Sequence, residues 1–198
     1  MEVKKVYDNK GKCISGLLQI NPKLFHDSRG FFQESWNKKI WEESLKSQNQ
    51  FPKSFVQDNH SRSRKGTLRG LHYQLDPYSQ GKLVRCINGV IYDVAVDLRK
   101  DSETFGKWAA IELSSENNIQ FWIPSGFAHG FLTLSSEADL VYKVNEYWNK
   151  SSERILNWSD KKLAIDWPQD ILENTQIELS DKDKNAPFLA QLCEHDLF

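Results

Sequence analysis

The feature that most constrains the fold of this chain is a succession of short strand-like runs separated by turn residues. Runs rich in β-branched and aromatic side chains recur from the N-terminal region to the last third, and helical patterning is scarce. The predicted strands are Leu17–Ile20, Gly30–Trp36, Phe55–Asn59, Thr67–Gln74, Lys82–Ile87, Val90–Leu98, Trp108–Leu113, Gln120–Ile123, Phe131–Leu134 and Leu140–Val144. Many short strands in 198 residues predict an all-β, double-sheet jelly roll.

Two local patterns refine this prediction. Asn88-Gly89 lies between two of the runs and is a strong β-hairpin signal, because type I′ turns require positive φ at both central residues. Along Val90–Leu98, valines and Tyr92 alternate with Ile91, Asp93, Ala95 and Asp97, so that one face of this strand is plainly apolar.

Helices are expected to be few and short. Asn37–Lys46 places apolar side chains on one side, and Ser159–Leu163 is expected to form a short turn capped by Ser159 or Asp160. No repeat, low-complexity tract or linker divides the chain, which predicts a single domain over residues 1–198.

Composition excludes several functional classes. With 26 basic and 27 acidic side chains, the chain lacks the excess of positive charge that would attract nucleic acids or anionic membranes. No apolar run is long enough for a membrane helix or a signal-peptide core. Cys13, Cys86 and Cys193 are odd in number and lack metal-ligand spacing. These features predict a cytoplasmic protein that binds neither nucleic acid nor membrane.

Aromatic side chains are abundant, at 12 % of the chain, and seven of them are Trp. Trp and Tyr often line sites for ring-shaped ligands, yet their commonest use is burial in a core. Composition by itself leaves both interpretations open.

His72 and His129 are the informative histidines, although a lone histidine is more often structural than catalytic. His72 lies in a strand pattern close to the cations Arg69, Lys82 and Arg85. Polar side chains inside a sandwich need partners, and a water-containing pocket between the sheets supplies them. These cations predict an anionic ligand such as a phosphate ester.

A geometric difficulty accompanies this pocket. Arg69 and His72 point to opposite faces of a regular strand, so both reach one pocket only if the strand deforms between them. Gly70 is the predicted bulge.

The stretches Gly66–Gly89 and Pro124–His129 resemble the two motifs of the cupins, which are jelly-roll proteins. Metal-binding cupins place a second histidine where this chain has Gln74, and no glutamate occurs between Gln74 and Gly89. Two imidazoles without a carboxylate make a poor transition-metal site, so no metal and no other cofactor is expected.

A closer resemblance covers almost the whole chain, in order from about Leu17 to about Leu192. The sequence is similar to the dTDP-4-dehydrorhamnose 3,5-epimerases over Phe25–Ser35, Phe55–Ser61, Gly66–Gln74, Gln80–Arg85, Trp122–Gly130, Tyr142-Lys143 and Leu179–Asp183. Such enzymes invert C3 and C5 of a 4-keto-6-deoxyhexose carried on thymidine diphosphate, and they do so in dTDP-L-rhamnose biosynthesis. Both carbons flank the C4 ketone, so the reaction needs a base, an opposed acid and a cation near the carbonyl oxygen.

The resemblance also implies residue roles. His72 corresponds to the base and Asp183 to the carboxylate that orients it, as in a Ser-His-Asp triad. Tyr142 corresponds to the acid and Lys82 to the residue that holds the enolate oxygen. The implied substrate-binding residues are Arg29, Glu34, Gln57, Asn59, Arg69, His129, Glu153 and Lys182. The implied assembly is a homodimer with exchanged N-terminal strands, which would cover exposed sheet edges.

Three alternatives stay open at this stage. An epimerase acting on C3 alone would keep His72, Asp183 and Lys82. Two departures from the family leave this alternative open: Trp41–Lys53 is long and polar for the family, and Gln74–Tyr78 is expected to shape the sugar pocket. A non-catalytic cupin that binds a sugar nucleotide would not need a base, an orienting carboxylate and an opposed acid together. A metal-dependent cupin oxygenase or isomerase is opposed by Gln74.

Overall fold

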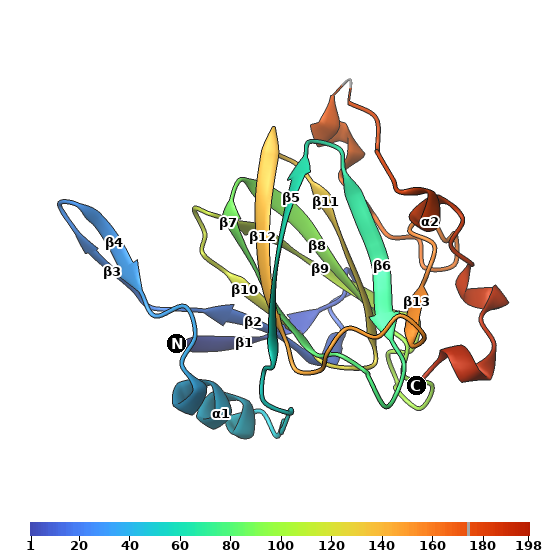
Figure 1. Cartoon of the computed structure of the whole chain (residues 1–198), viewed down its shortest axis with the longest axis horizontal. Coiled ribbons are helices and arrows are strands. Elements are labelled where there is room, and N and C mark those ends of the chain that lie inside the picture. Colours follow the sequence, from blue (N-terminus) through green and yellow to red (C-terminus); the bar gives the residue numbers. More distant parts are fainter. Residues whose placement is uncertain (174) are drawn as a thin grey trace.

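Two facing antiparallel sheets form the body of the protein, seen in a computed structural model that describes residues 1–173 and 175–198 (Figure 1). In the described part of the chain, one sheet has the order β1-β2-β10-β7-β12-β5 and the other the order β13-β6-β11-β8-β9. The all-β double-sheet prediction is confirmed. The strands of the first sheet are β1 (Glu2–Tyr7), β2 (Cys13–Asn21), β5 (Gln57–Arg64), β7 (Lys82–Asn88), β10 (Gln120–Ile123) and β12 (Glu137–Val144). Those of the second are β6 (Leu68–Gln74), β8 (Val90–Asp97), β9 (Trp108–Ser114), β11 (Phe127–Thr133) and β13 (Glu153–Ile155).

The predicted strands are present, although their ends move. The last predicted strand begins at Glu137 instead of Leu140, and the one at Phe131–Leu134 extends back to Phe127. Three strands were not expected, namely β1, β13 and β3 (Leu24–Asp27). Each is short or lies at an edge, where a strand needs no apolar alternation.

The hairpin predicted at Asn88-Gly89 is wrong. β7 pairs with β10 and β12, whereas β8 pairs with β11 and β9, so the chain passes there from one sheet to the other. Gly89 does have the predicted positive φ, +77°, and a Cβ atom there would lie 2.1 Å from the Glu137 carbonyl oxygen. Asn88 does not have the positive φ that a type I′ turn also requires, so only the conformation of Gly89 is as predicted. Both strands are central and find partners in different sheets.

The interior of the described part of the chain has three apolar clusters. One lies between the sheets and includes Ile91, Ala95 and Phe121, and another covers the outer face of the second sheet beneath the C-terminal segments. The third surrounds Trp122 of the first sheet. β8 therefore has no solvent face: its valines pack outward under the C-terminal region, and its Ile/Asp/Ala/Asp face lies between the sheets. Asp93 and Asp97 are both fully buried.

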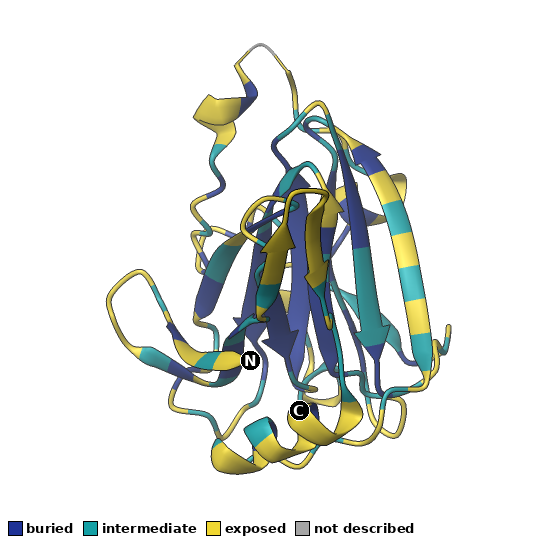
Figure 2. Ribbon diagram, turned by 90° about the vertical axis from the view of Figure 1, so that its left-hand side faces the viewer, coloured by how far each residue is buried: buried dark blue, intermediate teal, exposed yellow. Residues whose placement is uncertain are grey.

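An N-terminal arm leaves this body. β3 and β4 (Gly30–Gln33) form a hairpin that projects away from the sheets (Figure 1), and Figure 2 shows it largely exposed while the strands inside the sandwich are buried. Phe25, Phe31 and Phe32 are exposed on it, and Phe32 is 69 % accessible. The predicted strand Gly30–Trp36 stops at Gln33.

The helices are short, as expected. α1 (Lys38–Ser47) begins after Asn37, whose side chain accepts a hydrogen bond from the Ile40 amide, and it packs Trp41 and Leu45 beside Trp122 of β10. Asp160 caps the predicted turn at residues 159–163, and α2 (Asp181–Lys184) follows near the C-terminus with 3₁₀ turns at Gln169–Leu172, Leu189–Gln191 and Glu194–Asp196. Neither α1 nor any other described helix has the length and apolar composition that spanning a membrane requires.

Candidate active site

His72 and Arg69 reach the same cavity because β6 is deformed between them. Against β11, His72 faces His129 and Arg69 faces Phe131, so β6 carries one residue more than its partner. This is the bulge predicted at Gly70, where φ is +121° and a Cβ atom would lie 2.6 Å from the Gly130 Cα. The extra residue brings side chains from opposite faces of a regular strand to one side.

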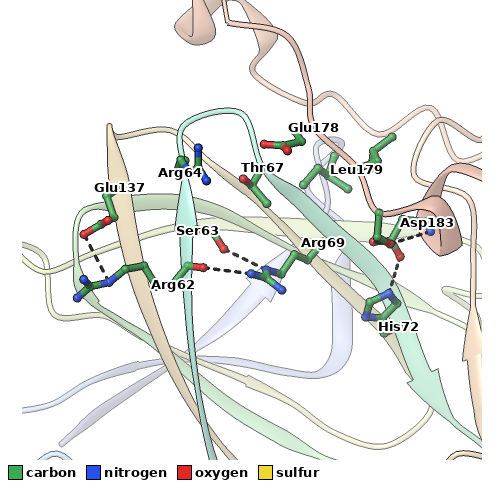
Figure 3. A pocket seen from close by; sticks show the side chains of 12 residues that line it. Arg62, Ser63, Arg64, Thr67, Arg69, His72, Glu137, Glu178, Leu179 and Asp183 are labelled. Carbon is green, nitrogen blue, oxygen red and sulfur yellow. Dashed lines mark hydrogen bonds and ion pairs between the residues drawn. The ribbon is translucent and has the colours of Figure 1, made fainter.

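A carboxylate holds the His72 ring. Its Nε2 lies 2.6 Å from Oδ1 of Asp183, which comes from α2, 111 residues further along the chain (Figure 3). The other oxygen of Asp183 accepts a hydrogen bond from the Ser180 hydroxyl at 2.8 Å, and Ser180 also caps α2 by accepting the Asp183 amide. Both carboxylate oxygens are therefore fixed by donors.

These donors outweigh burial in setting the charge of Asp183. Burial raises its pKa, but hydrogen bonds from His72, Ser180 and the Gly70 amide, together with the charge of His72, hold the pKa below its ordinary value of 3.8. Asp183 is thus an anion near neutral pH. With Nε2–H donated to that anion, Nδ1 of His72 is the nitrogen free to accept a proton.

Tyr142 and Lys82 face His72 from the opposite sheet. A cavity of about 350 Å³ is lined by His72 from β6, Lys82 from β7 and Tyr142 from β12, with Tyr73, Gln74, Gln57, Asn59, Gln80, Trp148 and Glu153 around them. Lys82 Nζ lies 3.3 Å from the His72 carbonyl oxygen. A base, a phenol and an ammonium group therefore border one space between the sheets.

Burial shifts the pKa of both groups on this opposite sheet. Desolvation lowers the pKa of Lys82 to about 8, although the charges of Asp93 and Glu153 oppose the shift. Burial raises the pKa of Tyr142 above 10.0, with Arg69 acting in the opposite direction. At neutral pH the site accordingly presents a charged amine and a protonated phenol.

His129 forms a second pair with a carboxylate. Its Nε2 lies 2.7 Å from Oδ1 of Asp93 on the neighbouring strand β8, and both side chains are buried. Burial lowers the pKa of His129, with Asp93 opposing the shift. Oδ2 of Asp93 has no hydrogen-bond partner among the described residues.

A second cavity of about 510 Å³ adjoins the first at His72 (Figure 3). Arg69 projects into it from β6, and its guanidinium group donates to the Ser63 hydroxyl at 3.0 Å and to the Arg62 carbonyl at 3.1 Å. Arg62 and Arg64 from β5 also line it. Glu137, Glu178 and Asp183 line it too, and Arg62 is paired with Asp139 and Glu137, so the lining is mixed in charge. Arg69, whose guanidinium group donates to neutral oxygens, is the cation that suits a phosphate-bearing ligand.

Four of the predicted positions do not line a cavity beside His72: His129, which is buried against Asp93, and Arg85, Arg29 and Glu34. Arg85 does not share the pocket of Lys82, because residues three apart on β7 point to opposite faces. It lines a cavity on the outer side of the sheet with Trp36 and Lys143.

Arg29 is at the tip of the arm, where it pairs with Asp27 at 2.6 Å, and Glu34 accepts a hydrogen bond from Asn37. Neither arm residue lines a cavity beside His72 in this single chain.

The remaining predicted residues form the rim. Lys182 pairs with Glu153 at 2.5 Å, next to Asp183 on the same helix. Gln57 donates to Asn59 at 2.8 Å, and both line the cavity of Tyr142.

Trp148 and Gln80 line the same cavity and were not predicted. The high Trp content is compatible with an aromatic cavity lining but does not identify the Trp, and Gln80 lies within the family-like stretch Gln80–Arg85 without a local pattern that marks it. Gln74 is buried and turned toward backbone groups. Among residues 1–173 and 175–198, no three His, Cys, Asp or Glu side chains gather closely enough to hold a metal ion.

Comparison with known proteins agrees with this geometry. Residues 12–191 match the family model described as dTDP-4-dehydrorhamnose 3,5-epimerase. The chain is 56 % identical to such an epimerase of Shigella flexneri, covering 87 % of this chain and 91 % of the relative, and 50 % identical to that of Salmonella typhimurium, covering 90 % and 93 %. It superposes with a TM-score of 0.87 and 45 % identity, over 99 % of this chain and 97 % of the other, on the dTDP-6-deoxy-D-glucose-3,5-epimerase of Legionella pneumophila solved with dTDP-4-keto-L-rhamnose. This chain belongs to the dTDP-4-dehydrorhamnose 3,5-epimerase family.

Proposed function

We propose that this enzyme inverts C3 and C5 of dTDP-4-dehydro-6-deoxy-D-glucose to give dTDP-4-dehydro-L-rhamnose, by proton abstraction and return through an enolate. The observation that carries the proposal is the placement of His72, backed by Asp183 at 2.6 Å, across one cavity from Tyr142 and Lys82. The family membership supplies the substrate class. This pathway step serves dTDP-L-rhamnose biosynthesis.

Proton removal falls to His72. Its Nδ1 accepts the proton from the carbon beside the ketone, and the electron pair of the broken C–H bond moves into the enolate. The resulting imidazolium is stabilised by Asp183, which keeps Nε2–H directed toward itself.

Charge on the enolate oxygen is balanced by Lys82. Its ammonium group lies between the sheets with little water around it, where a fixed charge acts strongly on a developing anion. Because its pKa is about 8, Lys82 carries this charge at neutral pH.

Proton return on the opposite face falls to Tyr142. Its phenol gives a proton to the carbanion as the C4 carbonyl re-forms, and solvent then restores the phenol and the neutral imidazole. Inversion at C5 and at C3 uses the same groups, with the sugar turning between the two steps.

The arm is the basis for proposing a homodimer. Phe25, Phe31 and Phe32 leave a large apolar area uncovered on a two-stranded hairpin, which is marginally stable alone in water. Crossing to a second copy would bury these rings and carry Arg29 and Glu34 to the partner's nucleotide site, where Arg29 would meet the diphosphate. We further propose that residues 1–198 act as one cupin-type epimerase domain in the cytoplasm.

Proton NMR of the 4-keto-6-deoxy sugar nucleotide in deuterated buffer tests the function. Deuterium should enter at both C3 and C5 with inversion. Deuterium at C3 alone would replace the proposal with a C3 epimerase, and deuterium at neither carbon with a sugar-nucleotide-binding protein. Metal analysis of the active protein adds a second test, since a stoichiometric transition metal required for turnover would contradict the enolate mechanism.

A further inference from the structure

β13 is a short strand that lies beside the candidate base (Figure 1). It has three residues, forms an edge of the second sheet and pairs with β6, where Arg154 faces Tyr73 and Ile155 faces His72. Short edge strands open easily, because few hydrogen bonds hold them. Contacts outside the ladder therefore matter for keeping β13 against β6.

The inner face of β13 connects the sheet to the helix that carries Asp183. Glu153 of β13 lines the cavity of Tyr142 and pairs with Lys182 at 2.5 Å. Lys182 precedes Asp183 on α2, and Asp183 accepts a hydrogen bond from the His72 ring at 2.6 Å. β6, β13 and α2 therefore form a closed ring of contacts, in which a shift of β13 would pull α2 away from His72.

A single acidic residue joins the two strands on their outer face. The Asp196 carboxylate accepts a hydrogen bond from Arg154 Nε at 2.7 Å, and the Asp196 backbone carbonyl accepts one from the Tyr73 hydroxyl at 2.9 Å. Because Arg154 and Tyr73 are cross-strand partners, Asp196 bridges β13 and β6 at one level of the ladder. Hydrogen bonds from Cys193 and Arg154 lower the pKa of Asp196, and burial raises the pKa of Tyr73. Near neutral pH, Asp196 is thus an anion and Tyr73 a neutral phenol.

Asp196 is itself held in place by the segment 192–198. Leu197 and Phe198 pack on the apolar cluster outside the second sheet, and the Phe198 amide donates to the Leu98 carbonyl at 3.3 Å. The segment lies beyond the residues that match the family model, so family membership assigns it no role.

We propose that Asp196 is a positioning residue, which links β13 to β6 and thereby keeps Asp183 of α2 at hydrogen-bond distance from His72. Arg154 and Asp196 are both partly accessible, so their ion pair adds little to the stability of the whole fold. Its effect falls on geometry, because a displacement of roughly 1 Å at a reacting group is enough to slow catalysis. The inference rests on the proposed function, since the step it supports is proton removal by His72.

Kinetics of variants on both sides of this link test the proposal. Asp196→Ala removes the carboxylate but keeps the carbonyl that binds Tyr73. We expect kcat to fall about tenfold, while the Kd for dTDP stays within about twofold and the melting temperature falls by less than about 4 °C. Arg154→Met breaks the same contact from β13, and the double variant should be no slower than the slower single variant.

Glu194→Ala is the matched control. Glu194 lies in the same 3₁₀ turn as Asp196, and its side chain makes no hydrogen bond or ion pair within the described part of the chain. Its kcat should equal that of the unaltered enzyme.

Proton NMR of the His72 ring N–H provides a readout that does not depend on turnover. A ring N–H donated to a carboxylate is protected from exchange with water, and its resonance is assigned by its loss in His72→Ala. In Asp196→Ala this proton should exchange at least about tenfold faster. The ring N–H of His129, which pairs with Asp93, should exchange at its original rate.

An unchanged kcat in Asp196→Ala, additive effects in the double variant, or equally faster exchange at both histidines would overturn the inference. Arg154→Met repeats both measurements if Asp196→Ala does not fold. A different result would contradict the proposed function instead: no deuterium incorporation by the unaltered enzyme, although its His72 ring N–H is protected.

Discussion

The molecule contains two histidine–carboxylate pairs that look alike in isolation. His72 lies 2.6 Å from Asp183 and His129 lies 2.7 Å from Asp93, and the two histidines face one another across β6 and β11. They differ in what surrounds them. His72 is one-third accessible and borders both cavities, whereas His129 is buried and its carboxylate keeps one oxygen unpaired among the described residues.

This difference separates a proton carrier from a neutral hydrogen-bonding group. A general base must reach its substrate and must be able to become positively charged. His72 meets the first condition because it borders open cavities, and the second because the Asp183 anion stabilises its imidazolium form. Burial lowers the pKa of His129 and so favours its neutral form. A distance of under 3 Å between imidazole and carboxylate is therefore insufficient to identify a catalytic pair.

The largest expected effect separates the two histidines directly. His72→Ala should lower the rate of deuterium incorporation at C3 and C5 by about 10³- to 10⁴-fold while leaving the affinity for dTDP within about threefold, because only the base is lost. His129→Ala, measured in parallel by NMR and calorimetry, should lose far less exchange. Equal losses in the two variants would show that both pairs carry protons.

The carboxylates provide the next comparison. Asp183→Asn should lower kcat by about 10³-fold, since an amide beside Nε2 favours the wrong imidazole tautomer, and it should also lower the melting temperature because this buried carboxylate loses charge-assisted hydrogen bonds. Asp93→Asn should lower the melting temperature as well but change kcat far less, because Asp93 is buried against His129 and neither residue lines the cavities beside His72. Steady-state kinetics and thermal melts of both variants check this prediction. Equal losses of kcat in the two variants would show that the two carboxylates do not differ in function.

Tyr142→Phe sharpens the assignment of the opposed acid. The variant should lose about 10²-fold in inversion but much less in exchange, because His72 can still remove a proton and return it on the same face. A single proton NMR experiment in deuterated buffer measures both the rate of inversion and the rate of deuterium exchange. Inversion at the unaltered rate would assign the acid to another group.

The smallest effect concerns pH. Lys82 has its pKa lowered to about 8, so it is protonated below that pH and becomes neutral above it. Turnover should therefore fall about tenfold per pH unit above pH 8. Tyr142 retains its proton over this range because its pKa is raised above 10.0. A rate that stays flat to pH 10 would exclude a charged Lys82 from the rate-limiting step.

Sequence reasoning located the strands well and their partners less well. Gln120–Ile123 is predicted residue for residue, because continuous apolar runs bounded by polar residues mark buried strands. The Asn88-Gly89 hairpin failed although the positive φ at Gly89 was foreseen. Backbone conformation at a turn is a local property, whereas the choice of pairing partner depends on strands far away in the chain.

For the candidate site, too, the sequence identified residues but not their surroundings. Residue types and order, with the family resemblance, were enough to nominate His72, Asp183, Tyr142 and Lys82. The sequence did not separate Lys82 from Arg85, nor did it single out Trp148. Which side of a sheet a residue faces, and which loop closes over a cavity, depend on tertiary packing.

By itself the amino-acid sequence determined an all-β chain, a bulge at Gly70 and the chemical groups an epimerase needs, because side-chain period, backbone freedom and functional chemistry are encoded locally. The family resemblance implied the pairing of Asp183 with His72, but only the tertiary structure shows its 2.6 Å contact, the burial of Asp93 behind His129, and the position of Arg85 and the arm outside the cavity of this chain. The reason is that burial and convergence depend on contacts between residues far apart in sequence. His72 and Asp183, for instance, are 111 positions apart.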